Sequence, residues 1–178
     1  MNYDALAPGA NPPYDINVII EVPMNADPIK YEIDKETNAL MVDRFMHTSM
    51  AYPCNYGFIP HTLSDDGDPL DVLLHCPFPL LPNCVVKARP IGVLLMEDEK
   101  GTDEKILAVP ARELTNEFDN VRSSADIPKA IIRKIAHFFE HYKDLEDEKW
   151  VRIIGWHDEV VAREIIRDAL DFHQQKIA

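Results

Sequence analysis

Basic residues and cysteines are both scarce in this sequence of 178 residues. The 18 Lys and Arg are outnumbered by 31 Asp and Glu, which leaves a formal net charge of -13 at pH 7. Such a charge repels nucleic-acid backbones and anionic membrane surfaces, so we expect neither as a partner. The three cysteines, Cys54, Cys76 and Cys84, form no CxxC pair and cannot all join internal disulfides, which predicts reduced thiols.

Long hydrophobic runs and targeting signals are also missing. The longest aliphatic run, Ile91 to Met96, is far too short to span a bilayer. The N-terminus has no basic segment leading into an apolar one, and no Asn-x-Ser/Thr glycosylation signal occurs. These absences indicate a soluble cytoplasmic protein. The length and the 46% hydrophobic content fit a single domain over residues 1–178.

Short runs typical of β-strands fill the chain from Ile16 to about Leu114, after a segment rich in Pro and Gly (residues 1–15) that we expect to be an arm or a cap. The runs are INVIIEV (16–22), IKYEID (29–34), ALMVDRF (39–45), LDVLL (70–74), CVVKARPIGVLLM (84–96) and KILAVP (105–110).

The hydrophobic period changes to a helical one after Ser123. Asp126 and Pro128 predict a helix start. Its apolar stripe would comprise Ile131, Ile135, Phe138, Phe139, Tyr142 and Leu145. A second helix is expected from about Asp158 to Gln174, with Val161, Ile165, Ala169 and Phe172 facing inward. Strands followed by two helices predict an α+β fold, most simply a small antiparallel barrel with the helices packed against it.

An acidic cluster, Asp65-Asp66-Gly67-Asp68-Pro69-Leu70-Asp71, is the most informative segment. A solvated turn explains Asp65, but Asp71 lies in phase with Leu73 at the start of an apolar run. Carboxylates that converge at 4 Å repel by about 4 kcal/mol per pair at an effective dielectric of 20, so cations or protons must neutralise them. An EF-hand is excluded, because a loop beginning at Asp66 would place Asp71 where the sharp turn needs glycine.

A second acidic patch, Glu97-Asp98-Glu99 with Asp103, follows the strand that ends at Met96, and Lys105 opens the next run. Alone, this pattern is a common hairpin tip. Together, the two patches supply only oxygen ligands, which suit Mg²⁺ or Mn²⁺ better than Zn²⁺.

Basic and hydroxyl side chains stand among these carboxylates. Strand alternation puts Lys30, Glu32 and Asp34 on one face. Arg44 is either an arginine reaching out of a strand end or an inward cation aimed at an anion. Other polar groups of this kind are Tyr52, Tyr56, Tyr142 and Lys143. The combination fits a small, highly charged anion held through divalent cations, such as a phosphate, with a metal-bound water whose pKa falls from 15.7 toward about 7 as nucleophile.

Taken together, these motifs resemble the soluble inorganic pyrophosphatases of family I in their short bacterial form. DGDPLDV (66–72) is similar to the family's D-x-D-P-x-D signature. The other matching motifs, in the family's order, are EVP (21–23), KYE (30–32), VDRF (42–45), YPCNYG (52–57), MEDEKGTDEK (96–105) and HFFEHYKDLE (137–146). The resemblance covers about Ile16 to Gly155.

The resemblance implies a five-stranded OB-like barrel and Mg²⁺-dependent hydrolysis of pyrophosphate to two orthophosphates, with three to four Mg²⁺ per active site and Mn²⁺ as a possible substitute. Asp66, Asp71 and Asp103 would hold the first metal, Asp71 would bridge to the second, Asp98 and Asp103 would take a further ion, and Glu21 a fourth through water. Asp68 would be the general base. The groups holding phosphate oxygens would be Lys30, Arg44, Lys105, Tyr142 and Lys143. Glu32 and Tyr56 would orient waters or neighbouring ligands.

Two other classes of protein remain open at this point. A non-enzymatic OB-fold binding module has no use for the carboxylates. A zinc peptidase is suggested by His137-Phe138-Phe139-Glu140-His141, which matches H-x-x-E-H, but only 37 residues follow His141. The resemblance also implies a homohexamer, a dimer of trimers, for which we expect His137 and His141 at a subunit interface and loosening toward trimers between about pH 6 and 5.

Overall fold

The computed structural model describes residues 3–34 and 36–177, in which strands fill the first two thirds and helices gather at the end. The strands are β1 (Ile16–Val22), β2 (Ile29–Ile33), β3 (Leu40–Phe45), β4 (Asn55–Phe58), β5 (Asp71–Leu74), β6 (Val85–Asp98), β7 (Gly101–Pro110) and β8 (Val151–His157). The helices are α1 (Lys129–His141), α2 (Glu159–Ile177) and the short 3-10 turns η1 (Tyr3–Ala5) and η2 (Ser124–Asp126).

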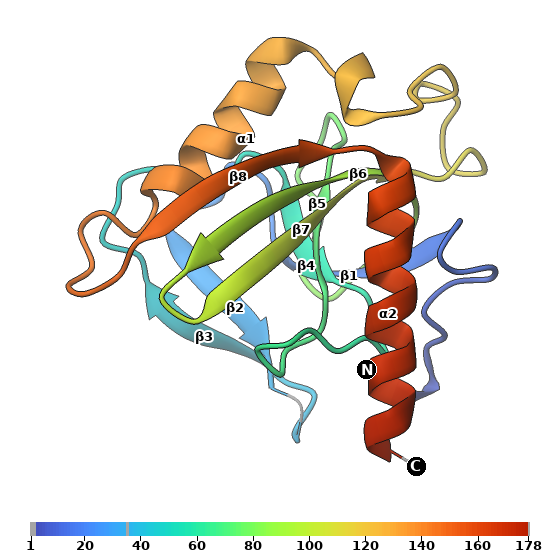
Figure 1. Cartoon of the computed structure of the whole chain (residues 1–178), viewed down its shortest axis with the longest axis horizontal. Coiled ribbons are helices and arrows are strands. Elements are labelled where there is room, and N and C mark those ends of the chain that lie inside the picture. Colours follow the sequence, from blue (N-terminus) through green and yellow to red (C-terminus); the bar gives the residue numbers. More distant parts are fainter. Residues whose placement is uncertain (1–2, 35, 178) are drawn as a thin grey trace.

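Five strands close into a barrel in the order β1-β4-β5-β7-β6, because β6 also pairs with β1. Strand β8 extends the sheet beyond β6, and β2 and β3 form a separate hairpin beside the barrel (Figure 1). The α+β class and the five-stranded ring are therefore as expected. Two details were wrong: three further strands lie outside the ring, and β5 pairs with β7 in parallel rather than antiparallel fashion.

Strand β6 is long enough to serve three neighbours. Its first four residues pair with β1, residues 88–98 pair with β7, and residues 93–98 pair with β8. The register with β7 shifts between Pro90 and Gly92. Proline has no N–H to donate to the ladder, so a break in regular pairing at this point is expected.

Both faces of the central strands are covered, which explains why their sequences are continuously apolar. In β7, Ile106 and Ala108 belong to the cluster that includes Ala162 of α2, whereas Leu107 and Val109 belong to the cluster that includes Ile135 of α1. The two helices thus pack on opposite sides of the same strands. This arrangement fixes the ends of β5 and β7, from which acidic residues project.

The helices form where the sequence predicts them, with slightly different ends. The apolar stripe of α1 is buried as expected at Ile135, Phe138, Phe139 and Tyr142, and so is Ala169 of α2. Helix α1 stops at His141, and Leu145 is 67% exposed rather than part of the apolar stripe. In α2 the buried line is Ala162, Ile166 and Ala169. Val161 and Ile165 are only partly buried, one position off the expected face.

Two strands were missed. Strand β4 is four residues long and contains Gly57, and β8 lies between an acidic loop and a helix. The N-terminal segment does act as a cap, since Tyr3 is buried against Ile19 and Ile33. Within the described residues, no helix is long and apolar enough to cross a membrane.

Candidate active site

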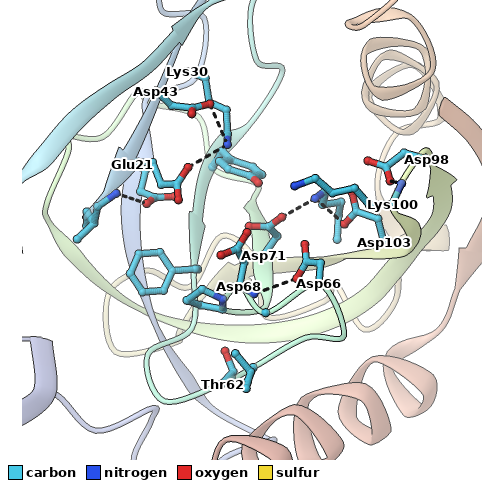
Figure 2. Close-up of a pocket in the computed structure, with 18 of the residues that line it drawn as sticks. Glu21, Lys30, Asp43, Thr62, Asp66, Asp68, Asp71, Asp98, Lys100 and Asp103 are labelled. Atoms are coloured by element: carbon cyan, nitrogen blue, oxygen red, sulfur yellow. Dashed lines mark hydrogen bonds and ion pairs between the residues drawn. The ribbon is translucent and has the colours of Figure 1, made fainter. Parts of the chain in front are cut away.

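A cleft with a volume of about 640 Å³ opens where the hairpin, the loop before β5 and the tip of β6–β7 meet (Figure 2). Every site residue predicted from the sequence lines it: Glu21, Lys30, Glu32, Arg44, Tyr56, Asp66, Asp68, Asp71, Asp98, Asp103, Lys105, Tyr142 and Lys143. Residues up to 122 positions apart in the chain are brought together here. Asp65 does not line the cleft, in keeping with its interpretation as a turn residue.

Lys105 lies between two of the carboxylates. The parallel register pairs Asp71 of β5 with Lys105 of β7. The Lys105 Nζ forms an ion pair with Asp71 and another with Asp103, whose Oδ1 is 2.7 Å away. Burial alone would lower the pKa of Lys105, but the charges of Asp71 and Asp103 raise it well above its usual range. The ammonium group therefore stays charged and neutralises part of the acidic cluster.

A second buried lysine pairs with carboxylates at the tip of the β6–β7 hairpin. Lys143, in the segment that follows α1, donates from Nζ to Asp98 Oδ2 at 2.7 Å and lies 3.4 Å from Glu99 Oε1. Burial alone would raise the pKa of Asp98, but the hydrogen bonds from Lys143 and from the backbone N–H of Lys100 lower it. Asp98 is thus held as an anion at the edge of the cleft.

The opposite wall is formed by β1 and the β2–β3 hairpin. Glu21 is 5% exposed and accepts a hydrogen bond from the Ile33 N–H at 2.7 Å. Burial is the main cause that raises the pKa of Glu21 to about 8. Lys30 Nζ lies 3.2 Å from Asp43 Oδ2 (Figure 2). It also lies 3.2 Å from Glu32 Oε2, so this cation is held between two carboxylates.

A bulge in the hairpin decides which side chains reach the cleft. The register runs Lys30 to Arg44 and then Tyr31 to Val42, so that Asp43 has no partner on β2. Asp43 and Arg44, consecutive in sequence, consequently both line the cleft. Asp34, expected on the face of Lys30 and Glu32, is instead bonded to Thr37 in the turn that follows.

Tyrosine hydroxyls complete the wall beneath the cations. Tyr52, Tyr56 and Tyr142 are 2%, 6% and 7% exposed. Burial raises the pKa of Tyr56 well above its usual range, and burial likewise raises the pKa of Tyr142. Both phenols therefore keep their protons at neutral pH, and their hydroxyl groups can donate hydrogen bonds to an anion.

The acidic loop before β5 is held in shape by its own backbone. The Ser64 N–H donates to the Asp68 carbonyl at 2.8 Å, and the Asp68 N–H donates to Asp66 Oδ1 at 3.0 Å. Gly67 has a φ of 88°, a conformation that glycine adopts without strain. The buried hydroxyl of Thr62 accepts from the Leu70 N–H at 2.9 Å and ties the loop to the barrel.

The composition of the lining fits divalent cations. Nine carboxylates face six Lys and Arg side chains, so the described cleft carries excess negative charge. Carboxylate oxygens are the donors that Mg²⁺ prefers. Across residues 3–34 and 36–177, no group of three His, Cys, Asp or Glu side chains is arranged closely enough to coordinate a metal ion. Lys105 is bonded to Asp71 and Asp103 instead.

The zinc-peptidase interpretation finds no support. His137 and His141 lie outside the cleft, with ring centroids 4.5 Å apart, and His141 Nδ1 is 2.8 Å from Asp144 Oδ2. No third ligand joins them among the described residues.

Sequence reasoning missed three charged residues of the lining, Asp43, Lys100 and Lys149. Asp43 reaches the cleft only because of the bulge, which the alternating pattern does not reveal. Lys149 lies in the polar loop between α1 and β8, where no periodicity exists. The available signals were the motifs VDRF and MEDEKGTDEK, which contain Asp43 and Lys100.

Comparison with known proteins gives a consistent result along the whole chain. The family model described as inorganic pyrophosphatase matches residues 18–174. An inorganic pyrophosphatase of Agrobacterium fabrum is 58% identical over 96% of this chain and 97% of its own length, and one of Brucella melitensis is 57% identical over the same shares. The crystal structure of inorganic pyrophosphatase from Thermus thermophilus aligns with a TM-score of 0.91 at 41% identity, over 98% of this chain and 99% of the other.

Proposed function

Since this chain belongs to the inorganic pyrophosphatase family and hydrolyses pyrophosphate, we propose that it does so with Mg²⁺ held in the acidic cleft and with Asp68 as general base. The observation that carries this proposal is the convergence of all the predicted metal, anion and proton-transfer residues on one cleft. A non-enzymatic binding module would have no use for that set.

We assign the ions to carboxylates of the cleft in the pattern that the family resemblance implies. Asp66, Asp71 and Asp103 would hold the first, Asp71 would bridge to the second, Asp98 and Asp103 would hold a further ion, and Glu21 a fourth through water. When bound, three to four Mg²⁺, or Mn²⁺ in their place, supply positive charge for phosphate oxygens and lower the pKa of a coordinated water.

Proton transfer falls to Asp68, whose carboxylate accepts a proton from the attacking water. Two hydrogen bonds of Asp68 keep this acceptor in place: its carbonyl accepts from the Ser64 N–H, and its own N–H donates to the Asp66 side-chain Oδ1. Tyr56 and Glu32 orient the neighbouring ligands and waters.

The cations and phenols of the other walls bind the anion. Positive or hydroxyl groups reach the cleft from the hairpin, from β7 and from the end of α1, so that they surround a small anion from several sides. The side chains that we assign to this task are Lys30, Arg44, Lys105, Tyr142 and Lys143. The two that are buried and paired, Lys105 and Lys143, also stabilise the charge that develops on the departing phosphate.

We further propose that the protein works as a homohexamer, a dimer of trimers, in the cytoplasm. Three free thiols, Cys54, Cys76 and Cys84, suit a reducing compartment. Exposed apolar side chains on the outside of the hairpin, Met41, Val42 and Phe45, are surface that subunit contacts could cover.

Orthophosphate release from pyrophosphate, measured with and without Mg²⁺ and compared with release from a phosphomonoester, tests the proposed function. We expect release that requires Mg²⁺ and is at least 100-fold faster for pyrophosphate. Release that is independent of added metal, or equal rates for the two substrates, would contradict the proposal.

A further inference from the structure

The loop between α1 and β8 carries a carboxylate that contacts two cations of the cleft. Glu146 Oε2 lies 3.2 Å from Arg44 Nη1 and 2.9 Å from Lys149 Nζ. Arg44 and Lys149 line the cleft, whereas Glu146 is not among the lining residues. The contact with Arg44 joins residues 102 positions apart.

Glu146 is nearly buried, which makes its pairing energetically important. Its side chain is 10% exposed, and its Oε1 is buried without a hydrogen-bond partner among the described residues, as is Arg44 Nε. Burial alone would raise the pKa of Glu146, but the hydrogen bond from Lys149 and the charge of Arg44 lower it. A buried carboxylate that stays ionised depends on its cationic partners, and loss of either partner is costly.

The backbone fixes where this carboxylate stands. The Glu146 N–H donates to the Lys143 carbonyl at 2.9 Å, and Lys143 is itself bonded to Asp98. On the other side, His47 Nδ1 lies 3.2 Å from the Leu145 carbonyl oxygen. The loop is therefore attached both to the hairpin tip of β6–β7 and to the chain just beyond β3.

We propose that Glu146 is a positioning residue, which holds Arg44 and Lys149 side by side at the cleft so that both meet the same phosphate group of the substrate. The proposal rests on the proposed function and adds Lys149 to its anion-binding groups. The three side chains keep a net charge of +1, and each cation is oriented before the substrate arrives. Substrate binding then avoids the entropic cost of ordering two long side chains.

Glu146→Gln, which keeps the shape and removes the charge, tests the proposal. We expect the KM for magnesium pyrophosphate to rise about 10-fold while kcat changes less than threefold, because the cations lose their orientation but the general base does not. Glu146→Asp, which keeps the charge, should recover part of the loss. Glu148→Gln is the matched control, since Glu148 is exposed in the same loop and the charge change is the same.

A double-mutant cycle separates positioning from a purely structural role. In a background in which both cations are replaced, Arg44→Gln with Lys149→Gln, the further change Glu146→Gln should raise KM by no more than twofold, because both groups it positions are gone. A full 10-fold rise in that background, or an unchanged KM in the single variant, would overturn the proposal.

Orthophosphate binding in the presence of Mg²⁺, measured by calorimetry, gives a readout without turnover. We expect about 10-fold weaker binding in Glu146→Gln than in Glu148→Gln, and equal binding in the two would contradict the role of Glu146. Absence of pyrophosphate hydrolysis by the wild-type protein would instead count against the proposed function, so the two failures are distinguishable.

Discussion

Individual charged residues of the cleft are held in pairs and trios before any substrate is present. Lys105 joins Asp71 and Asp103, Lys143 joins Asp98, and Lys30 lies between Glu32 and Asp43. Because Lys105, Lys143 and Asp98 are buried, removal of one partner from their pairs leaves a costly unpaired charge. Glu21 differs from these pairs, because burial prevails there and its carboxylate accepts a hydrogen bond from the backbone N–H of Ile33.

The shifted pKa of Glu21 predicts how stability depends on pH in metal-free protein. Its ordinary value is 4.5, and burial raises it to about 8 in the fold, so between these values the folded protein holds a proton that the unfolded chain releases. The free energy of unfolding should therefore fall as pH rises from about 4.5 to about 8, by a few kcal/mol. Urea denaturation at pH 5 and pH 8 with EDTA measures this fall.

Glu21→Gln isolates the contribution of this one group. The variant should equal the wild type near pH 5 and exceed it at pH 8, because glutamine carries no charge to bury. The exposed Glu36 gives the control, and Glu36→Gln should follow the wild-type curve. Parallel curves for Glu21→Gln and the wild type would show that Glu21 is ionised in the fold.

The sequence pattern identified the main site residues, but it did not identify the charged residues that contact them. Carboxylates in DGDPLDV and cations in period with strands could be recognised because their residue types are unusual at those places. Asp43 and Lys149 could not, since one depends on a bulge and the other on the path of an irregular loop. Glu146 is the last residue of the HFFEHYKDLE motif, but the motif alone does not indicate its contact with Arg44.

The pairing register of a few strands decides which of these residues lie side by side. The parallel β5–β7 register sets Asp71 beside Lys105, and the β2–β3 register sets Lys30 beside Arg44. Strand β4 lies between β1 and β5 and carries Tyr56 into the cleft. A small displacement of β4 would therefore disturb its pairing with β1 and β5 and would also move Tyr56 in the cleft.

Gly57 allows β4 to lie close against β1. A Cβ at Gly57 would lie 1.8 Å from the Ile19 carbonyl oxygen of β1, far inside van der Waals contact. Gly57→Ala should therefore lower the free energy of unfolding by about 2–4 kcal/mol and reduce activity, since backbone must move. Gly101→Ala is the comparison, because nothing lies within 4 Å there and only its φ of 128° is strained. Equal stability of Gly57→Ala and wild type in urea would refute this account of β4.

Elements with strong periodicity could be predicted, and those without it could not. The runs that became β1, β5 and β7 are apolar enough to recognise, and α1 shows a clear stripe. Strand β4 is too short and contains a glycine, and β8 alternates only weakly, so both were missed. The parallel β5–β7 pairing is a property of the tertiary arrangement and leaves no local signature.

At the scale of the whole molecule, a closed barrel lies between α1 and α2 (Figure 1). The cleft is lined by residues of the barrel, of the β2–β3 hairpin and of the segment after α1. The excess of negative charge, -13 overall, is thus partly concentrated where divalent ions are expected to bind. The face of α1 that carries His137 and His141 lies outside the cleft and is available for assembly.

Assembly should respond to pH through this histidine pair. We predict a hexamer at pH 8 that loosens toward trimers between about pH 6 and 5, because protonation places like charges together across a symmetry axis. Asp144 and Glu140 lie 2.8 and 3.7 Å from His141 and offset part of that charge. The double variant His137→Gln, His141→Gln should reduce the effect in sedimentation velocity. A monomer at pH 8, or dissociation unchanged by the double substitution, would contradict the assembly role.

The central claim is that a carboxylate of the acidic cleft removes the proton from the attacking water while its neighbours hold the metal. The most direct test is the turnover of Asp68→Asn on pyrophosphate at saturating Mg²⁺, with the melting temperature recorded in the presence and absence of Mg²⁺. We predict that kcat falls by roughly 10² to 10⁴ while the Mg²⁺-induced rise in melting temperature is retained. Near wild-type turnover at neutral pH in this variant would contradict the claim.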